Sequence, residues 1–191
     1  MISGILLAAG AARRFGGGKL LHLLPDGTPI GLASLRNLEA ALARVVVVIR
    51  PEDHAIARLY AEARAQTIVC TDADRGMGHS LAAGVAHEAQ ARGWVVALAD
   101  MPNVMPSTIR AIATTLSEQG GIVVPYLGAE RGHPVAFSQG FREELLGLHG
   151  DSGARSVLQA HPGEVHRLQV DDPGIIQDID TPADLQRPSR G

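Results

Sequence analysis

Short, unbroken apolar runs recur along the first two thirds of the chain. They cover residues 5–9, 45–49, 67–70, 94–99 and 122–124. Runs of this length that are rich in Val, Ile and Leu are typical of strands buried on both faces of a parallel sheet. We therefore expect each of these segments to be a strand of one such sheet.

The segments between these runs predict helices. Three of them have helical spacing and follow or include a proline at their start: residues 30–43 after Pro29, 52–65 after Pro51, and 108–119 after Pro106. Proline is favoured at the first helical position because its missing N–H would have no partner inside the helix. Strand and helix alternate to about residue 125, which predicts a three-layer α/β sandwich with a mostly parallel sheet.

Composition narrows the class of protein. The chain has 191 residues, only 3% of them aromatic, and a formal net charge of −3, which argues against nucleic acid as a partner. The apolar runs are far shorter than the ~20 residues that span a bilayer, and the amino terminus does not read as a signal peptide. The lone cysteine, Cys70, excludes an internal disulfide and a cysteine zinc site. We expect a cytoplasmic protein without a membrane partner, folded as one domain over residues 1–187 with a frayed tail at 188–191.

A glycine-rich loop follows the first apolar run. It carries Arg13, Arg14 and Lys19, and Lys19 is the only lysine among seventeen basic residues. Backbone N–H groups and cations in such a loop can hold a polyphosphate. Leu20 stands where a Walker loop has Ser or Thr, and the dinucleotide spacing of glycines is absent. The alternative is a flexible loop with solvated charges.

Two further segments carry carboxylates. Asp100 directly follows the run at 94–99, at the sheet edge where α/β folds bind ligands, and a carboxylate there suits Mg²⁺; it could instead cap a turn. Asp178 and Asp180 would face one side of a strand, whereas Thr181 with Asp184 also fits an ordinary helix start.

Two glycine-containing loops, at residues 75–81 and 150–155, precede helical stretches and could bind anions or merely cap the helices. His133 lies in a turn bounded by glycine and proline that could line a pocket. The other histidines show no metal-binding spacing.

Taken together, these motifs resemble the MobA-like nucleotidyltransferase family, and within it the molybdenum cofactor cytidylyltransferases. The residues that carry the resemblance are Leu7-Ala8-Ala9-Gly10 with Arg14, Gly16 and Lys19; Gly76-Met77-Gly78 with Ser80; Leu98 to Pro102; Gly132 to Val135; Gly150-Asp151 with Gly153 to Arg155; and Asp178 to Pro182. The resemblance implies a Rossmann-like fold of the nucleotide-diphospho-sugar transferase type. It further implies a nucleotide-binding part at about 1–125 and an acceptor-binding part at about 126–187. Ala12 departs from the family, which often has Ser or Gly there.

The implied activity is Mg²⁺-dependent transfer of CMP from CTP to the phosphate of molybdopterin, with release of pyrophosphate. The implied catalytic residues are Arg14, Lys19 and Asp100, and the implied metal ligands are Asp100 and Asp180, with Asp178 as the alternative to Asp180. The implied nucleotide contacts are Leu7, Ala8, Ala9, Gly10, Arg14, Lys19, Gly76, Met77 and Ser80. The implied acceptor contacts are His133, Asp151 and Arg155.

The preference for CTP comes from Ala9, because guanylyl members of the family tend to have glycine at that position. The alternatives are a transferase that uses GTP or a sugar or polyol phosphate, and a non-catalytic carrier of the molybdenum cofactor. A client molybdoenzyme or its maturation chaperone is a possible partner.

Overall fold

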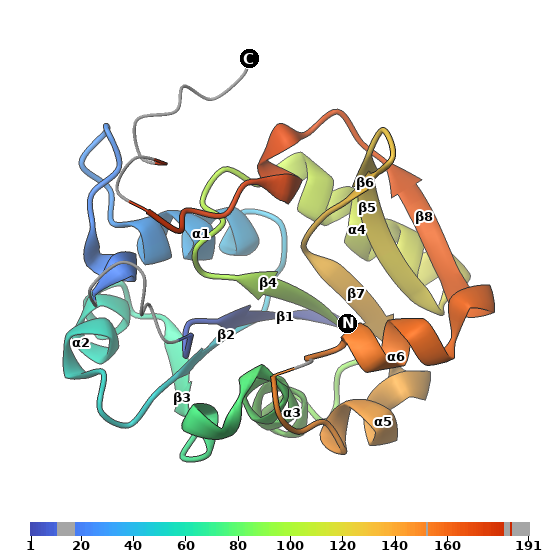
Figure 1. Cartoon of the computed structure of the whole chain (residues 1–191), viewed down its shortest axis with the longest axis horizontal. Coiled ribbons are helices and arrows are strands. Elements are labelled where there is room, and N and C mark those ends of the chain that lie inside the picture. The colour runs from blue at the N-terminus through green and yellow to red at the C-terminus, as the bar shows by residue number, and fades with distance from the viewer. Residues whose placement is uncertain (11–17, 152, 182–183, 185–191) are drawn as a thin grey trace.

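The computed structural model describes residues 1–10, 18–151, 153–181 and 184. Its centre is an eight-stranded sheet in the order β3-β2-β1-β4-β7-β5-β6, with β8 paired to β5 (Figure 1). The strands are β1 (Ile2–Leu7), β2 (Val45–Ile49), β3 (Gln66–Val69), β4 (Gly93–Leu98), β5 (Ile122–Leu127), β6 (Glu130–Arg131), β7 (Val135–Ser138) and β8 (Val165–Gln169). β1 to β4 are mutually parallel, whereas β7 runs antiparallel to both β4 and β5.

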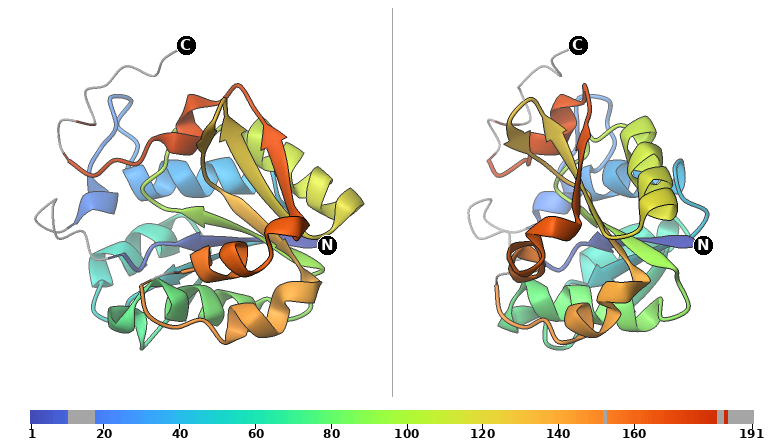
Figure 2. Two further views of the ribbon diagram at one scale, coloured as in Figure 1. Left: turned by 45° about the vertical axis from the view of Figure 1, so that its right-hand side comes forward. Right: turned by 90° about the vertical axis from the view of Figure 1, so that its right-hand side faces the viewer.

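Helices cover both faces of the sheet (Figure 2). They are α1 (Ile30–Glu39), α2 (His54–Glu62), α3 (Met77–His87), α4 (Pro106–Gln119), α5 (Arg142–Leu146) and α6 (Arg155–Ala160). Apolar residues of α1, α2 and α4 form one core cluster with the sheet, and those of α3, α5 and α6 form the other. The predicted three-layer sandwich is confirmed.

Successive side chains of each central strand point to opposite faces of the sheet and so belong to different core clusters. Ile5 and Leu7 face the α3 side, whereas Leu6 faces the α1 side, as the period of two requires. Helix α3 lies very close to β1, because a Cβ on Gly84 would stand 2.6 Å from Ile5 Cγ2. A glycine at this point therefore lets the helix approach the sheet.

Two parts of the sheet differ from the sequence prediction. β3 is the outermost strand of the sheet and three of its four residues are exposed, so it is not buried on both faces. β7, which was not among the predicted strands, is inserted antiparallel between β4 and β5 in the otherwise mostly parallel sheet that was expected. Short antiparallel strands of this kind carry little periodic signal, so the alternation rule does not find them.

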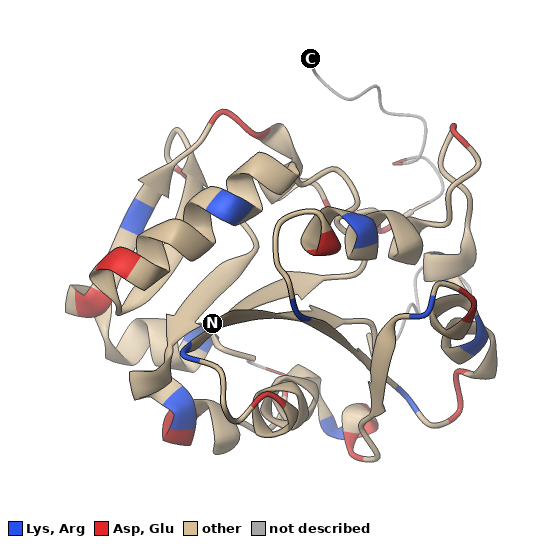
Figure 3. Cartoon of the chain, turned by 180° about the vertical axis from the view of Figure 1, so that it is seen from behind, with Lys and Arg blue, Asp and Glu red and all other residues tan. Residues whose placement is uncertain are grey.

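The surface carries both signs of charge. Acidic and basic residues are interspersed over the helices and loops on the side shown in Figure 3. Within the described ranges, no helix is long and apolar enough to cross a membrane.

A buried carboxylate fastens the carboxyl-terminal segment to the sheet. Asp172 is 1% exposed and accepts hydrogen bonds from the backbone N–H of Met105, at 2.8 Å, and of Gly174, at 2.9 Å. Further along, the backbone N–H of Ile179 donates to Asp100 O at 3.0 Å. The segment from Asp172 to Asp180 is thereby laid against the end of β4.

We expect Asp172→Ala to lower the free energy of unfolding by about 2–4 kcal/mol, because it leaves two backbone donors without their acceptor. Urea unfolding at pH 7 measures the change. Asp171→Ala, which alters an exposed neighbouring carboxylate, is the control and should shift stability by less than about 0.5 kcal/mol. Equal stability of the two variants would contradict the anchoring role.

Candidate active site

A large pocket opens at the carboxyl ends of the central parallel strands. Its volume is about 950 Å³, within the usual range for ligand sites. Its lining includes Leu7, Ala8, Ala9, Gly10, Lys19, Gly76, Met77, Ser80, Asp100, Asp151 and Asp180. In open α/β sheets this edge is the usual place of ligand binding.

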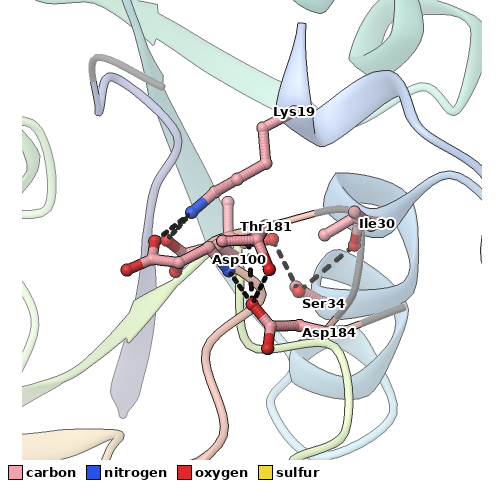
Figure 4. A network of polar contacts seen from close by, with 8 residues as sticks. Lys19, Ile30, Ser34, Asp100, Thr181 and Asp184 are labelled. Carbon is pink, nitrogen blue, oxygen red and sulfur yellow. Dashed lines mark hydrogen bonds and ion pairs between the residues drawn. The ribbon is translucent and has the colours of Figure 1, made fainter. Parts of the chain in front are cut away.

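Lys19 lies at the centre of the polar groups in this pocket. It begins a short 3-10 helix after Gly18, whose φ of 64° is in the left-handed region that favours glycine. The Lys19 ammonium donates to Asp100 Oδ2 at 2.7 Å and to Asp180 Oδ1 at 2.9 Å (Figure 4). Lys19 is 8% exposed, whereas the side chains of Asp100 and Asp180 are 26% and 40% exposed, so the ammonium is shielded from water while the carboxylates remain open to the pocket. The three residues are brought together from the first loop, the end of β4 and the carboxyl-terminal segment.

Helix α1 holds the turn that carries Asp100. The Ser34 hydroxyl donates to Ala99 O at 2.8 Å, and the Asn37 amide donates to Pro102 O at 2.8 Å. These bonds flank Asp100 on both sides, which fixes the direction in which its carboxylate leaves the strand end.

A second turn holds Asp180. Asp184 Oδ2 accepts hydrogen bonds from the Asp180 N–H at 3.2 Å and from the Thr181 N–H and hydroxyl, both at 2.8 Å. The sequence allowed this segment to be either a ligand-binding carboxylate pair or an ordinary capped turn. Both interpretations are compatible, because Asp184 caps the turn while Asp180 binds the Lys19 ammonium. In the described part of the chain, Asp178 makes no hydrogen bond to the Lys19 ammonium, although burial raises the pKa of the Asp178 carboxyl and the charge of Lys19 opposes that rise.

The charges of this cluster shift the pKa values of its members. Burial lowers the pKa of Lys19, but the hydrogen bonds and charges of Asp100 and Asp180 outweigh it, so the net shift is upward. Partial burial, followed by the charge of Asp180, raises the pKa of Asp178. Lys19 is therefore a cation at neutral pH, held among more negative charge than it can neutralise.

The two carboxylates fit a divalent metal ion. Mg²⁺ is usually held by one or two carboxylates together with substrate phosphates, rather than by a full protein cage. In the part of the chain that the structure describes, no group of three or more His, Cys, Asp or Glu side chains could hold a metal. A metal on Asp100 and Asp180 would therefore complete its coordination with ligand oxygens and water.

Two glycine-containing loops form one wall of the pocket. The Gly78 N–H donates to Gly150 O at 2.9 Å. A Cβ on Gly76 would stand 2.3 Å from Gly150 C, so the two backbones touch directly. The loops that the sequence marked as separate anion sites are thus joined, with Met77 and Asp151 facing the same pocket.

Not every predicted site residue lies in this pocket. Arg14 falls outside the described residues. Arg155 does not line the pocket, and His133 lines a small separate cavity with Ser34 and Met101. Burial is the main cause that lowers the pKa of His133, the charge of Arg131 adds to it, and Asp100 opposes it.

The residues directly after β2 also line the pocket, and they were not predicted from the sequence. Arg50, Glu52, Asp53 and His54 line the pocket, and Arg50 Nε donates to Ala9 O. The signal that could have found them is their place directly after a predicted strand, since the carboxyl ends of neighbouring parallel strands meet at one edge.

Comparison with known proteins finds one family. The model of the MobA-like NTP transferase domain matches residues 4–165. The chain is 36% identical to the purine catabolism protein PucB of Bacillus subtilis, over 94% of this chain and 91% of that one. It is 29% identical to nicotine blue oxidoreductase of Paenarthrobacter nicotinovorans, over 97% and 95% of the two chains. It is 24% identical to a probable molybdenum cofactor guanylyltransferase of Mycobacterium ulcerans, over 99% and 94%.

A solved structure with a similar fold is that of Rv0371c from Mycobacterium tuberculosis. It is 30% identical, with a TM-score of 0.85, and the match covers 100% of this chain and 97% of that one. The same protein has also been crystallised with manganese, and that structure matches at 28% identity with a TM-score of 0.75, over 88% of this chain and 87% of that one.

The burial of His133 predicts a stability difference that depends on pH. Because its pKa in the folded chain lies below the ordinary 6.5, the unfolded chain takes up a proton first as the pH falls through 6.5. The folded state then loses relative stability. We expect His133→Gln to gain stability relative to wild type as unfolding is measured from pH 8 down to pH 5. His149→Gln replaces an exposed histidine and controls for the substitution itself. A constant difference between His133→Gln and wild type would contradict the prediction.

Proposed function

The chain belongs to the MobA-like NTP transferase family, and from that premise we propose that it transfers CMP from CTP to the phosphate of molybdopterin and releases pyrophosphate. The observation that carries the proposal is the Lys19 ammonium between Asp100 and Asp180 in the 950 Å³ pocket. A cation and two carboxylates at a sheet edge suit a triphosphate with its metal ion.

The two substrates would be bound by two successive parts of the chain. Residues 1–125 would bind the nucleotide and residues 126–187 the acceptor. The first part supplies both strand ends and the loops at Gly10 and Gly76, and the second part adds Asp151 and Asp180 from the other side. His133 and Arg155 would take part only if the acceptor extends beyond the pocket. Arg14 is proposed as a triphosphate contact from its place in the glycine-rich loop.

The reaction needs little from the protein except position and charge. An oxygen of the acceptor phosphate attacks the α-phosphorus, the bond between the α-phosphorus and the bridging oxygen breaks, and pyrophosphate leaves in line. No general base is required, because a phosphate oxygen is already a nucleophile at neutral pH. Lys19 and Arg14 would hold the phosphates, and Asp100 with Asp180 would orient the metal ion.

We propose Mg²⁺ as the physiological metal. When bound to the two carboxylates, it would neutralise charge on the triphosphate as the transition state forms. The hard oxygen ligands of Asp100 and Asp180 support this choice, and the manganese complex of the related Rv0371c supports a divalent ion in general.

Ala9 supports CTP as the donor. It is 4% exposed, it lines the pocket, and its carbonyl accepts a hydrogen bond from Arg50. The neighbouring Ala8 N–H is bound to Val48 O at 2.9 Å. Because the backbone is held on both sides, the methyl group of Ala9 cannot retreat from a two-ring base. GTP is the alternative, and the relative named as a guanylyltransferase supports it.

The direct test incubates the protein with Mg²⁺, molybdopterin and each nucleoside triphosphate in turn, and follows pyrophosphate and the dinucleotide product. We expect turnover with CTP. Turnover with GTP instead would place the chain in the guanylyl branch. Binding of molybdopterin without pyrophosphate from any nucleotide would identify a carrier and overturn the proposal.

We expect Asp100→Asn to reduce the turnover rate by at least ~10²-fold, because asparagine keeps the shape but removes a charge that holds the metal. Circular dichroism checks that the variant is folded. Asp171→Asn removes an exposed carboxylate outside the pocket and should retain wild-type turnover. Near-normal turnover of a folded Asp100→Asn variant would exclude the metal role.

We expect Ala9→Gly to raise kcat/KM with GTP more than it lowers kcat/KM with CTP. One methyl group in a pocket discriminates by about 10–200-fold at most, so the ratio should move within that range. Ala97→Gly removes a methyl from the adjacent strand outside this pocket and controls for the added backbone freedom. An unchanged nucleotide ratio in Ala9→Gly would remove Ala9 from the account of specificity.

A further inference from the structure

We propose that Lys19 and the divalent ion compete for one place between Asp100 and Asp180, so that metal and triphosphate bind cooperatively. In this scheme the Lys19 ammonium leaves the carboxylates for the triphosphate when the metal arrives. The inference rests on the metal and nucleotide binding proposed above and adds how each controls the other.

The geometry sets the two cations in competition. The Lys19 ammonium is 2.7 Å from Asp100 Oδ2 and 2.9 Å from Asp180 Oδ1. A Mg²⁺ ion held by the same two carboxylate oxygens would need direct contact with both of them. Because the ammonium already occupies these acceptors, the metal and the ammonium would compete for them.

Charge balance determines when the exchange is favourable. A divalent ion that arrives alone breaks two ion pairs and leaves a shielded ammonium, only 8% exposed, without its anions. Breaking one side of a shielded ion pair is costly because the remaining charge is poorly solvated. A triphosphate removes this penalty, because it offers Lys19 a new anionic partner in the same pocket.

The chain around Lys19 allows the movement. Gly18 and Lys19 both line the pocket, and Lys19 is the first residue of its short helix. Its four-carbon side chain is flexible and carries a compact charge. The ammonium can therefore turn from the carboxylates toward a bound phosphate without displacement of the helix.

Thermodynamic linkage relates the effect of the nucleotide on metal affinity to the effect of the metal on nucleotide affinity. If the nucleotide tightens metal binding by some factor, the metal must tighten nucleotide binding by the same factor, and such factors are commonly about 5–150-fold. Removal of Lys19 should weaken the coupling between the two ligands, since the metal then no longer has to displace the ammonium.

The first experiment measures the Mn²⁺ dissociation constant by electron paramagnetic resonance, with and without the non-reacting α,β-methylene analogues of CTP and GTP. In wild type we expect an analogue to tighten Mn²⁺ binding at least ~10-fold. Without nucleotide, Lys19→Met should bind Mn²⁺ at least ~10-fold tighter than wild type. Lys19→Gln, which keeps a hydrogen-bond donor beside the carboxylates, provides the same test if Lys19→Met does not fold.

Two controls separate competition from general electrostatics. Arg50→Met also removes a cation that lines the pocket, but one that is bonded to Ala9 O rather than to the carboxylates, so its gain in Mn²⁺ affinity should be clearly smaller. Lys19→Met combined with Asp100→Asn should lose the gain. The proposal is overturned if neither Lys19 variant binds Mn²⁺ more tightly than wild type, or if Arg50→Met gains as much.

A second readout uses the wild-type chain. Because Lys19 is the only lysine, ¹⁵N-lysine labelling gives a single side-chain ammonium signal. We expect Mg²⁺ alone, at concentrations that saturate the site in the presence of analogue, to leave this signal in place, and Mg²⁺ with analogue to shift it. A signal that stays unchanged when both are bound, or moves equally with Mg²⁺ alone, would overturn the exchange.

Failure of the proposed function is a separate outcome, since the absence of pyrophosphate release affects neither the Mn²⁺ affinities of the nucleotide-free variants nor their comparison.

Discussion

Two carboxylates that share one cation are the constraint around which this molecule is arranged. Asp100 and Asp180 come from segments 80 residues apart in the chain, and Lys19 comes from a third. In a pocket partly shielded from water, two carboxylates this close repel each other unless a positive charge lies between them. Lys19 provides that charge, and so the first loop, the end of β4 and the carboxyl-terminal segment meet at one point.

Much of the surrounding structure serves to hold these carboxylates in place. The paired register of β1 and β4 runs from Ile2 with Gly93 to Leu7 with Leu98, so both strands end at the pocket. Ser34 and Asn37 hold the turn after β4, and Asp184 holds the turn at Asp180. Since these bonds come from the helical layer and from a separate turn, the carboxylates are positioned independently of any ligand. Such preorganisation lets a site stabilise charge without rearranging at the moment of reaction.

The sequence predicts the layers of this fold better than its irregular parts. Buried apolar runs and proline-led helices correctly indicate the strands from β1 to β5 and the helices α1, α2 and α4, because both signals are local. Antiparallel β7 and the exposure of β3 depend on which strands become neighbours, and no local pattern encodes that choice. For the same reason local patterns indicated Asp100 and Asp180 as acidic candidates and Lys19 as a phosphate ligand, and the family resemblance assigned both carboxylates to one metal, but the direct ion pairs of Lys19 with both carboxylates were not predicted. The proximity of Arg50 to Ala9 was likewise missed, since it arises from the pairing of β1 with β2.

The central claim is that one position between Asp100 and Asp180 serves first an ammonium group and then a metal ion shared with a triphosphate. The most direct test is a crystal structure with Mn²⁺ and a non-reacting CTP analogue, in which anomalous scattering locates the metal. The account predicts a manganese peak bridging Asp100 and Asp180, with the Lys19 ammonium turned onto the phosphates. Manganese bound elsewhere, with Lys19 still between the two carboxylates, would contradict it.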